Sequence, residues 1–190
     1  MGTPMPGAGR HRRRIRFATP TAKPAVSPKI IGGTDTTIGT APFMAQLWYY
    51  DKSNDLGFFC GGSVISPTKI LTVAPCVKDE HGKAYNWAEQ GSVVTSTAQL
   101  PTSTTNADGA TTVDLHGGQA TAVLRQWNHL SYSPPTINND IAVLTLALPV
   151  RATPIRLTTN TDAASYTVGK SATVYGWAAP APARTTSPTR

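Results

Sequence analysis

The two cysteines of the chain, Cys60 and Cys76, bracket one strongly patterned stretch that restricts the fold more than any other. Between them lie two β-rich runs, residues 58–65 and 69–73, joined by a Ser-Pro turn, and this pattern predicts a β-hairpin. The spacing of the cysteines is compatible with one disulfide, which would require an oxidising compartment. Two free buried thiols in a cytosolic protein are the alternative that the spacing leaves open.

The composition favours short strands over long helices. Only 14% of the 190 residues are charged, while Thr, Ser, Gly and Pro are abundant. Further strands are predicted over residues 42–50, 93–96, 111–115, 119–127 and 141–146, with residues 78–90 as a polar surface loop. A chain of this length can form one ordinary domain with a real core. We therefore expect an all-β protein, built as a small closed barrel or a sandwich.

The net charge of +7 belongs to one end of the chain. Residues 1–29 hold seven basic side chains and no acidic ones, whereas the rest of the chain holds ten of each. We interpret residues 1–29 as a disordered, solvated tail, although the arginine cluster could also touch phosphate or anionic lipid. The neutral remainder gives no reason to expect a nucleic-acid-binding surface. No apolar run is long enough for a transmembrane helix, and none has the pattern of a signal peptide.

Three short motifs follow one another along the chain. They are Lys29-Ile30-Ile31-Gly32-Gly33, the cysteine-bracketed hairpin that closes on Leu71-Thr72-Val73-Ala74-Pro75-Cys76-Val77, and Asn139-Asp140-Ile141-Ala142. Over about residues 29–178 the chain resembles the N-terminal part of the peptidase domain of chymotrypsin/trypsin-like serine proteases. The resemblance implies the first six-stranded antiparallel β-barrel of the double barrel, and at most the first strand or strands of the second barrel, at 169–177.

The same resemblance implies further properties. It divides the chain into a disordered basic leader (1–29), the peptidase domain (30–178) and a disordered tail (179–190). Cys60 and Cys76 would form a disulfide, activation cleavage would fall between Lys29 and Ile30, and the protein would be secreted. The partner would be a protein or peptide substrate. No cofactor, metal, nucleic acid or membrane is expected.

The catalytic residues depart from the family pattern. The family's aspartate, which orients the catalytic histidine, falls on Asp140, but the histidine position itself is Pro75. A simpler role for Asp140 would be to cap a turn through backbone N–H groups. The nucleophile motif Gly-Asp-Ser-Gly-Gly does not occur in the sequence, and neither His81 nor His116 lies at the base position.

The sequence therefore predicts a degenerate and truncated member of the trypsin-like serine endopeptidase family that is catalytically inactive as written. A pseudoprotease module that binds a protein or a polysaccharide is the alternative. A third hypothesis is half of a split protease, completed by a separate chain that supplies the serine. Pro75 argues against this third hypothesis, because even the completed enzyme would lack its base.

Overall fold

The computed structural model describes residues 33–177, and the predicted tails at 1–29 and 179–190 and the predicted cleavage site at Lys29 and Ile30 lie outside these residues. The strands are β1 (Met44–Asp51), β2 (Leu56–Ser66), β3 (Lys69–Thr72), β4 (Gly91–Thr95), β5 (Thr102–Thr105), β6 (Thr111–Asp114), β7 (Gln119–Asn128) and β8 (Ala142–Leu146). The helices are the 3₁₀ turns η1 (Ala74–Cys76) and η2 (Ala163–Tyr166) and the short α1 (Trp87–Gln90).

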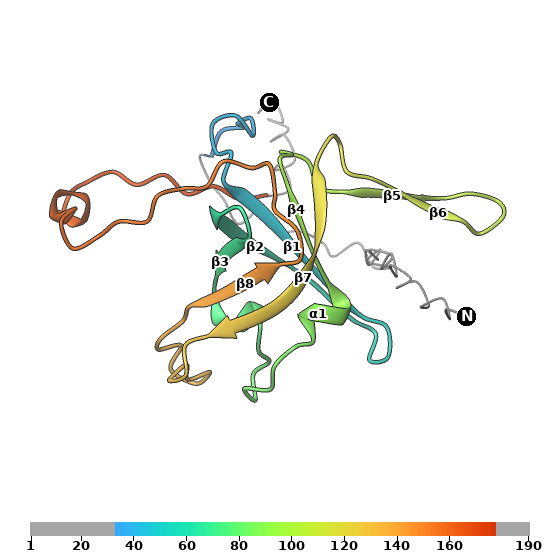
Figure 1. Ribbon diagram of the computed structural model, residues 1–190, viewed down its shortest axis with the longest axis horizontal. Coiled ribbons are helices and arrows are strands. Elements are labelled where there is room, and N and C mark those ends of the chain that lie inside the picture. The colour runs from blue at the N-terminus through green and yellow to red at the C-terminus, as the bar shows by residue number, and fades with distance from the viewer. Residues whose placement is uncertain (1–32, 178–190) are drawn as a thin grey trace, which may run out of the picture.

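Six strands close into an antiparallel barrel in the order β1-β2-β3-β8-β7-β4 (Figure 1). Strand β1 pairs with β2 along its whole length and with β4 on its other edge, so it lies between these two strands in the barrel. Strand β8 closes the barrel between β3 and β7. The predicted all-β fold and the six-stranded antiparallel barrel are confirmed.

The core fills the inside of the barrel. Alternate residues of β1 point inward, as strand geometry requires, and Ala45, Leu47 and Tyr49 are almost completely buried. The other strands contribute the same pattern, with Val64, Ile70, Val93, Val123, Ala142, Leu144 and Leu146 in one cluster. Burial of these side chains is the main favourable contribution to folding.

The prediction of a polar surface loop over residues 78–90 is partly wrong. The segment ends in α1, where Trp87 is fully buried and its indole Nε1–H donates to the carbonyl of Cys76 at 2.7 Å. Tyr85 packs against the same core, next to Tyr49 and Phe58. The prediction rested on the composition of the whole segment, which is mostly polar, and it therefore missed the burial of these two aromatic side chains.

Two further segments differ from the predicted strands. Strand β6 forms, but it pairs with β5, which was not predicted, and the two make a ribbon that projects from the barrel (Figure 1). Residues 169–177 form no strand, because no other described segment pairs with them. Aromatic contacts hold the end of this segment on the barrel instead. Tyr175 packs against Phe43 edge to face, and Trp177 packs against Phe59 in the same way. The indole N–H of Trp177 also donates to the carbonyl of residue 98.

The two cysteines are bonded. Cys60 in β2 and Cys76 in η1 form a disulfide with a Cα–Cα distance of 6.2 Å, within the usual range for such bonds. The predicted pairing is confirmed, and the alternative of two free thiols is excluded. The bond fastens η1 to the barrel, directly beside Ala74 and Pro75.

Candidate functional site

The register between β3 and β8 positions the candidate site. Thr72, the last residue of β3, pairs with Ala142, the first residue of β8. Ala74 lies two residues after Thr72, and Asp140 lies two residues before Ala142. Because the strands are antiparallel, the same pairing brings Ala74 and Asp140 together. The backbone N–H of Ala74 donates to Asp140 Oδ1 at 2.7 Å. The N–H group that donates to Asp140 therefore belongs to the neighbouring element η1, and not to the turn that contains Asp140.

Pro75 stands beside this hydrogen bond, in the first turn of η1. Its ring is compatible with that position, because the first N–H groups of a helical turn have no intrahelical acceptor. The side chain is exposed, while Ala74 and Cys76 on either side of it are buried. Pro75 thus faces outward, one residue after the N–H that binds Asp140, and it offers neither a titratable group nor a backbone donor.

A braced loop carries Asp140. Ile137 and Asn139 both adopt positive φ angles, 54° and 58°, a conformation that is unusual for an isoleucine and more easily adopted by asparagine. The Asn139 side-chain amide donates to the carbonyl of Ser131 at 2.9 Å, and this bond ties the two sides of the loop together. Burial, followed by the charge of Asp140, raises the pKa of the nearby Tyr132 phenol. Tyr132 was not predicted to lie near this carboxylate.

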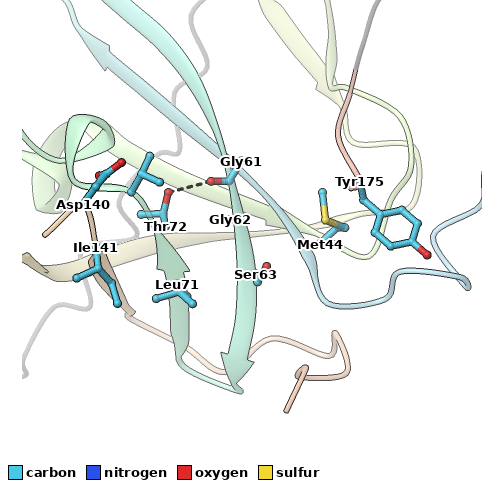
Figure 2. Close-up of a pocket in the computed structure, with 10 residues that line it drawn as sticks. Met44, Gly61, Gly62, Ser63, Leu71, Thr72, Asp140, Ile141 and Tyr175 are labelled. Carbon is cyan, nitrogen blue, oxygen red and sulfur yellow. Dashed lines mark hydrogen bonds between the residues drawn. The ribbon is translucent and has the colours of Figure 1, made fainter. Parts of the chain in front are cut away.

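An open hollow of about 450 Å³ lies beside Asp140, over β2 and β3 (Figure 2). Its described lining consists of Met44, Gly61, Gly62, Ser63, Leu71, Thr72, Val73, Asp140, Ile141 and Tyr175. The Thr72 hydroxyl is already engaged, because it donates to the carbonyl of Gly61 at 2.8 Å. Figure 2 shows Asp140 and Tyr175 at opposite ends of the hollow. Met44 and Tyr175 were not expected here, since no local pattern relates residues so far apart in the sequence.

The two remaining histidine candidates lie elsewhere. His81 is exposed and sits 3.5 Å from Glu80 in the segment before α1. The His116 ring lies between Asp114 Oδ2, at 3.4 Å, and the Thr102 hydroxyl, at 3.3 Å, at the base of the β5–β6 ribbon. Neither histidine lines the hollow beside Asp140.

Comparison with known proteins decides the family. The family model for trypsin matches residues 30–189, which is most of the chain. The chain belongs to the trypsin family. Within this family the barrel described above corresponds to the first barrel of the peptidase domain.

Individual relatives agree with this assignment. A trypsin from Saccharopolyspora erythraea is 28% identical over 148 residues, covering 78% of this chain and 55% of that protein. Brachyurin from Leptuca pugilator is 31% identical and covers 80% of this chain and 56% of its own length. Serine protease ea from Drosophila melanogaster is 32% identical, with 88% of this chain and 49% of that protein covered. The chain spans about half the length of the curated relatives it matches.

The described residues include neither a candidate membrane-spanning helix nor a candidate metal site. Within residues 33–177 no helix is long and apolar enough to cross a membrane. In the same part of the chain no three His, Cys, Asp or Glu side chains gather in a way that could hold a metal ion.

Proposed function

We propose that this trypsin-family chain does not hydrolyse peptide bonds, and that it acts by binding a protein or peptide. The family's acid would be Asp140 and the family's base position would be Pro75. The observation that supports the proposal is the hydrogen bond between the Ala74 N–H and Asp140, because the residue that follows Ala74 is the one we expect at the position of the base. That residue is a proline.

The chemistry explains why this substitution is decisive. In the family mechanism the histidine accepts the proton of the attacking serine and later delivers it to the leaving amine. A pyrrolidine ring can do neither. Loss of the base alone removes most of the roughly 10⁶-fold effect of a catalytic triad, whichever residue supplies the nucleophile. The disulfide is consistent with an oxidising compartment, and we propose that the protein is secreted.

Hydrolysis of a peptide ester by the purified chain tests the proposal. Esters are the sensitive substrates, because their leaving group needs little protonation. We expect a rate equal to that of buffer for the unaltered chain and for Asp140→Ala alike. Turnover by the unaltered chain that Asp140→Ala abolishes would show that the site is catalytic and would refute the proposal.

A further inference from the structure

A second hollow lies on the outer face of the barrel, over β3, β8 and β7, which are neighbours in the sheet (Figure 1). It is an open depression of about 530 Å³, and its described lining holds two cations and no acidic side chain. The lining residues are Lys69, Arg125, Gln126, Trp127, Val143 and Thr145. None of them lines the hollow beside Asp140, so the two hollows are separate features of the molecule.

The strand register sets the two cations in one row. Thr145 of β8 pairs with Lys69 on one side and with Arg125 on the other, so the three residues follow one another across the sheet. Side chains of residues directly opposite each other lie on the same face of a sheet. Two residues further along β7, Trp127 pairs with Val143 on this face. Two cations and an indole therefore come together from segments that are far apart in the sequence.

A β-bulge in β7 directs Arg125 outward. Val123 is buried in the core, and strict alternation would direct Arg125 to the core as well. The pairing with β8 shifts by one residue between these two positions, and Arg125 is exposed. Alternation then resumes, because the Gln126 amide donates to the carbonyl of the buried Val77 at 3.0 Å, while Trp127 is 49% exposed. The bulge thus places both Arg125 and Trp127 on the outer face.

The two cations have no anionic partner in the part of the chain that the structure describes. The Lys69 ammonium donates to the Thr145 hydroxyl at 2.7 Å, so its charged end lies over β8, the strand between Lys69 and Arg125. Two cations drawn together on one face of a sheet repel each other. An anionic group bound between them would be attracted by both, and this gives the surface a preference for negative charge.

Trp127 adds an apolar platform beside the cations. Its ring packs against His129 in a T-shaped arrangement with a centroid distance of 6.4 Å, which restricts the orientation of the indole. Its pairing partner Val143 is half-buried on the same face. Indole side chains frequently anchor protein interfaces. An aromatic side chain of a ligand could therefore pack on Trp127 while the anionic groups of that ligand bind the cations.

We propose that this face binds an acidic peptide segment of a partner protein, with carboxylates on Lys69 and Arg125 and an aromatic side chain on Trp127. Two cations match a short segment with two carboxylates. A nucleic acid or another polyanion is bound through many simultaneous charge contacts, and the described lining supplies only two. The inference rests on the proposed binding role, and it names a surface and the chemistry of the partner.

A titration with two matched peptides tests the inference. Acetyl-Glu-Ser-Glu-Ser-Phe-amide places two carboxylates and one ring on the same side of an extended chain, and acetyl-Gln-Ser-Gln-Ser-Phe-amide has nearly the same shape without the charges. The reporters are the Thr145 amide and the Trp127 indole N–H in the ¹⁵N-labelled full chain, because they respond to this face and not to the basic residues 1–29. We expect the acidic peptide to shift both resonances and to bind roughly five- to tenfold more tightly than the neutral one, with the preference shrinking as salt is added.

Variants locate the charge preference. Lys69→Gln/Arg125→Gln removes both cations, so the two peptides should then bind equally. Lys83→Gln/Lys170→Gln is the matched control, because it removes the same charge from exposed positions outside the hollow, and it should preserve the preference. Trp127→Ala, followed through the Thr145 amide, should weaken both peptides by a similar factor and keep the preference.

Several outcomes would overturn the inference. Equal binding of the two peptides to the unaltered chain, or binding of neither, would do so without help from any variant. Dextran sulfate that shifts both reporters where the acidic peptide shifts neither would show that the ligand is a polyanion. A preference that the control variant loses as fully as Lys69→Gln/Arg125→Gln would show that only the overall charge matters. Ester hydrolysis would instead refute the proposed function and leave charge-dependent binding on this face standing.

Discussion

At the scale of single residues, Asp140 adds a side-chain hydrogen bond between two segments that the pairing of β3 with β8 brings together. Its Oδ1 accepts the N–H of Ala74, the residue at which β3 passes into η1. Because the acceptor is charged and half-buried, this hydrogen bond is stronger than an average one. Asp140 therefore has a structural role in the fold that does not depend on the chemistry of the site.

This role predicts different effects for two substitutions. Asp140→Ala leaves the Ala74 N–H without an acceptor and should lower the free energy of unfolding by about 1–3 kcal/mol. Asp140→Asn retains a carbonyl oxygen at the same place and should cost clearly less. Urea unfolding at neutral pH measures both. Equal losses for the two variants would show that the charge, and not the hydrogen bond, supplies the stability.

At the scale of elements, the two adjacent glycines of β2 have different surroundings. A Cβ built on Gly62 would lie 2.7 Å from Ile70 Cγ2 and 2.8 Å from Leu47 Cδ1, inside the barrel, whereas a Cβ on Gly61 meets nothing within 4 Å. Core side chains cannot yield this much space without strain. The core therefore leaves no room for a side chain at Gly62, whereas a side chain at Gly61 would meet no other group.

Alanine substitutions at these glycines form a matched pair. Gly62→Ala should lower the free energy of unfolding by about 1–3 kcal/mol because it overpacks the core. Gly61→Ala should be close to neutral. Thermal unfolding of the two variants side by side checks the difference, and a loss at Gly61 as large as that at Gly62 would contradict the packing described for β2.

The turn between β1 and β2 carries a pH-dependent contribution to stability. Hydrogen bonds from the Asn54 side-chain amide, at 2.6 Å, and from the Ser53 N–H, at 2.9 Å, hold the pKa of Asp51 below its usual value. A carboxyl group whose pKa is lower in the folded state stabilises the fold above its unfolded pKa of about 4, and this contribution is lost as the pH falls through the folded pKa.

The variant Asn54→Ala removes the largest cause of that shift. It should bring the pKa of Asp51 back towards its ordinary value and flatten the loss of stability as the pH falls below about 4. Urea midpoints measured across this range test the expectation. An acid limb as steep as that of the unaltered chain would mean that Asn54 does not set the pKa of Asp51.

The elements also show which parts of the fold were predictable from the sequence. The hairpin of β2 and β3 and the start of β8 carry local motifs, so their strands and the disulfide were predicted correctly. Strand β5 was missed, because Thr102–Thr105 is exposed throughout and has no apolar alternation. The 169–177 segment was predicted as a strand from its resemblance to the start of the family's second barrel, but strand formation depends on a partner strand elsewhere in the molecule.

At the scale of the whole molecule, the disulfide acts on the unfolded chain. Its two cysteines are 16 positions apart, so the bond closes a short loop in the unfolded chain. On the chain-entropy model such a loop contributes about 3 kcal/mol to the free energy of unfolding. The hollow beside Asp140 is also a property of the whole molecule, since residues from Met44 to Tyr175 line it, and no local pattern could have revealed it.

Replacing both cysteines by alanine should therefore lower the free energy of unfolding by about 3 kcal/mol and leave the barrel able to form. Urea unfolding followed by circular dichroism provides the measurement. Reduction of the unaltered chain with a thiol is the matched control and should give a similar loss. No loss in either experiment would contradict a stabilising role for this bond.

A single substitution tests most directly the proposal that Pro75 occupies the position of a base beside Asp140. In Pro75→His the new imidazole should lie close to the Asp140 carboxylate, which favours the protonated ring and should raise the histidine pKa by roughly one unit above 6.5. That raised pKa would stabilise the fold below about pH 6.5, and the contribution would be lost as the pH rises through the folded value. Proton NMR titration of this histidine, with Pro75→His/Asp140→Asn as the control, is the measurement. A raised pKa that returns to about 6.5 in the double variant is the predicted result, whereas an ordinary pKa in both would contradict the placement of Pro75.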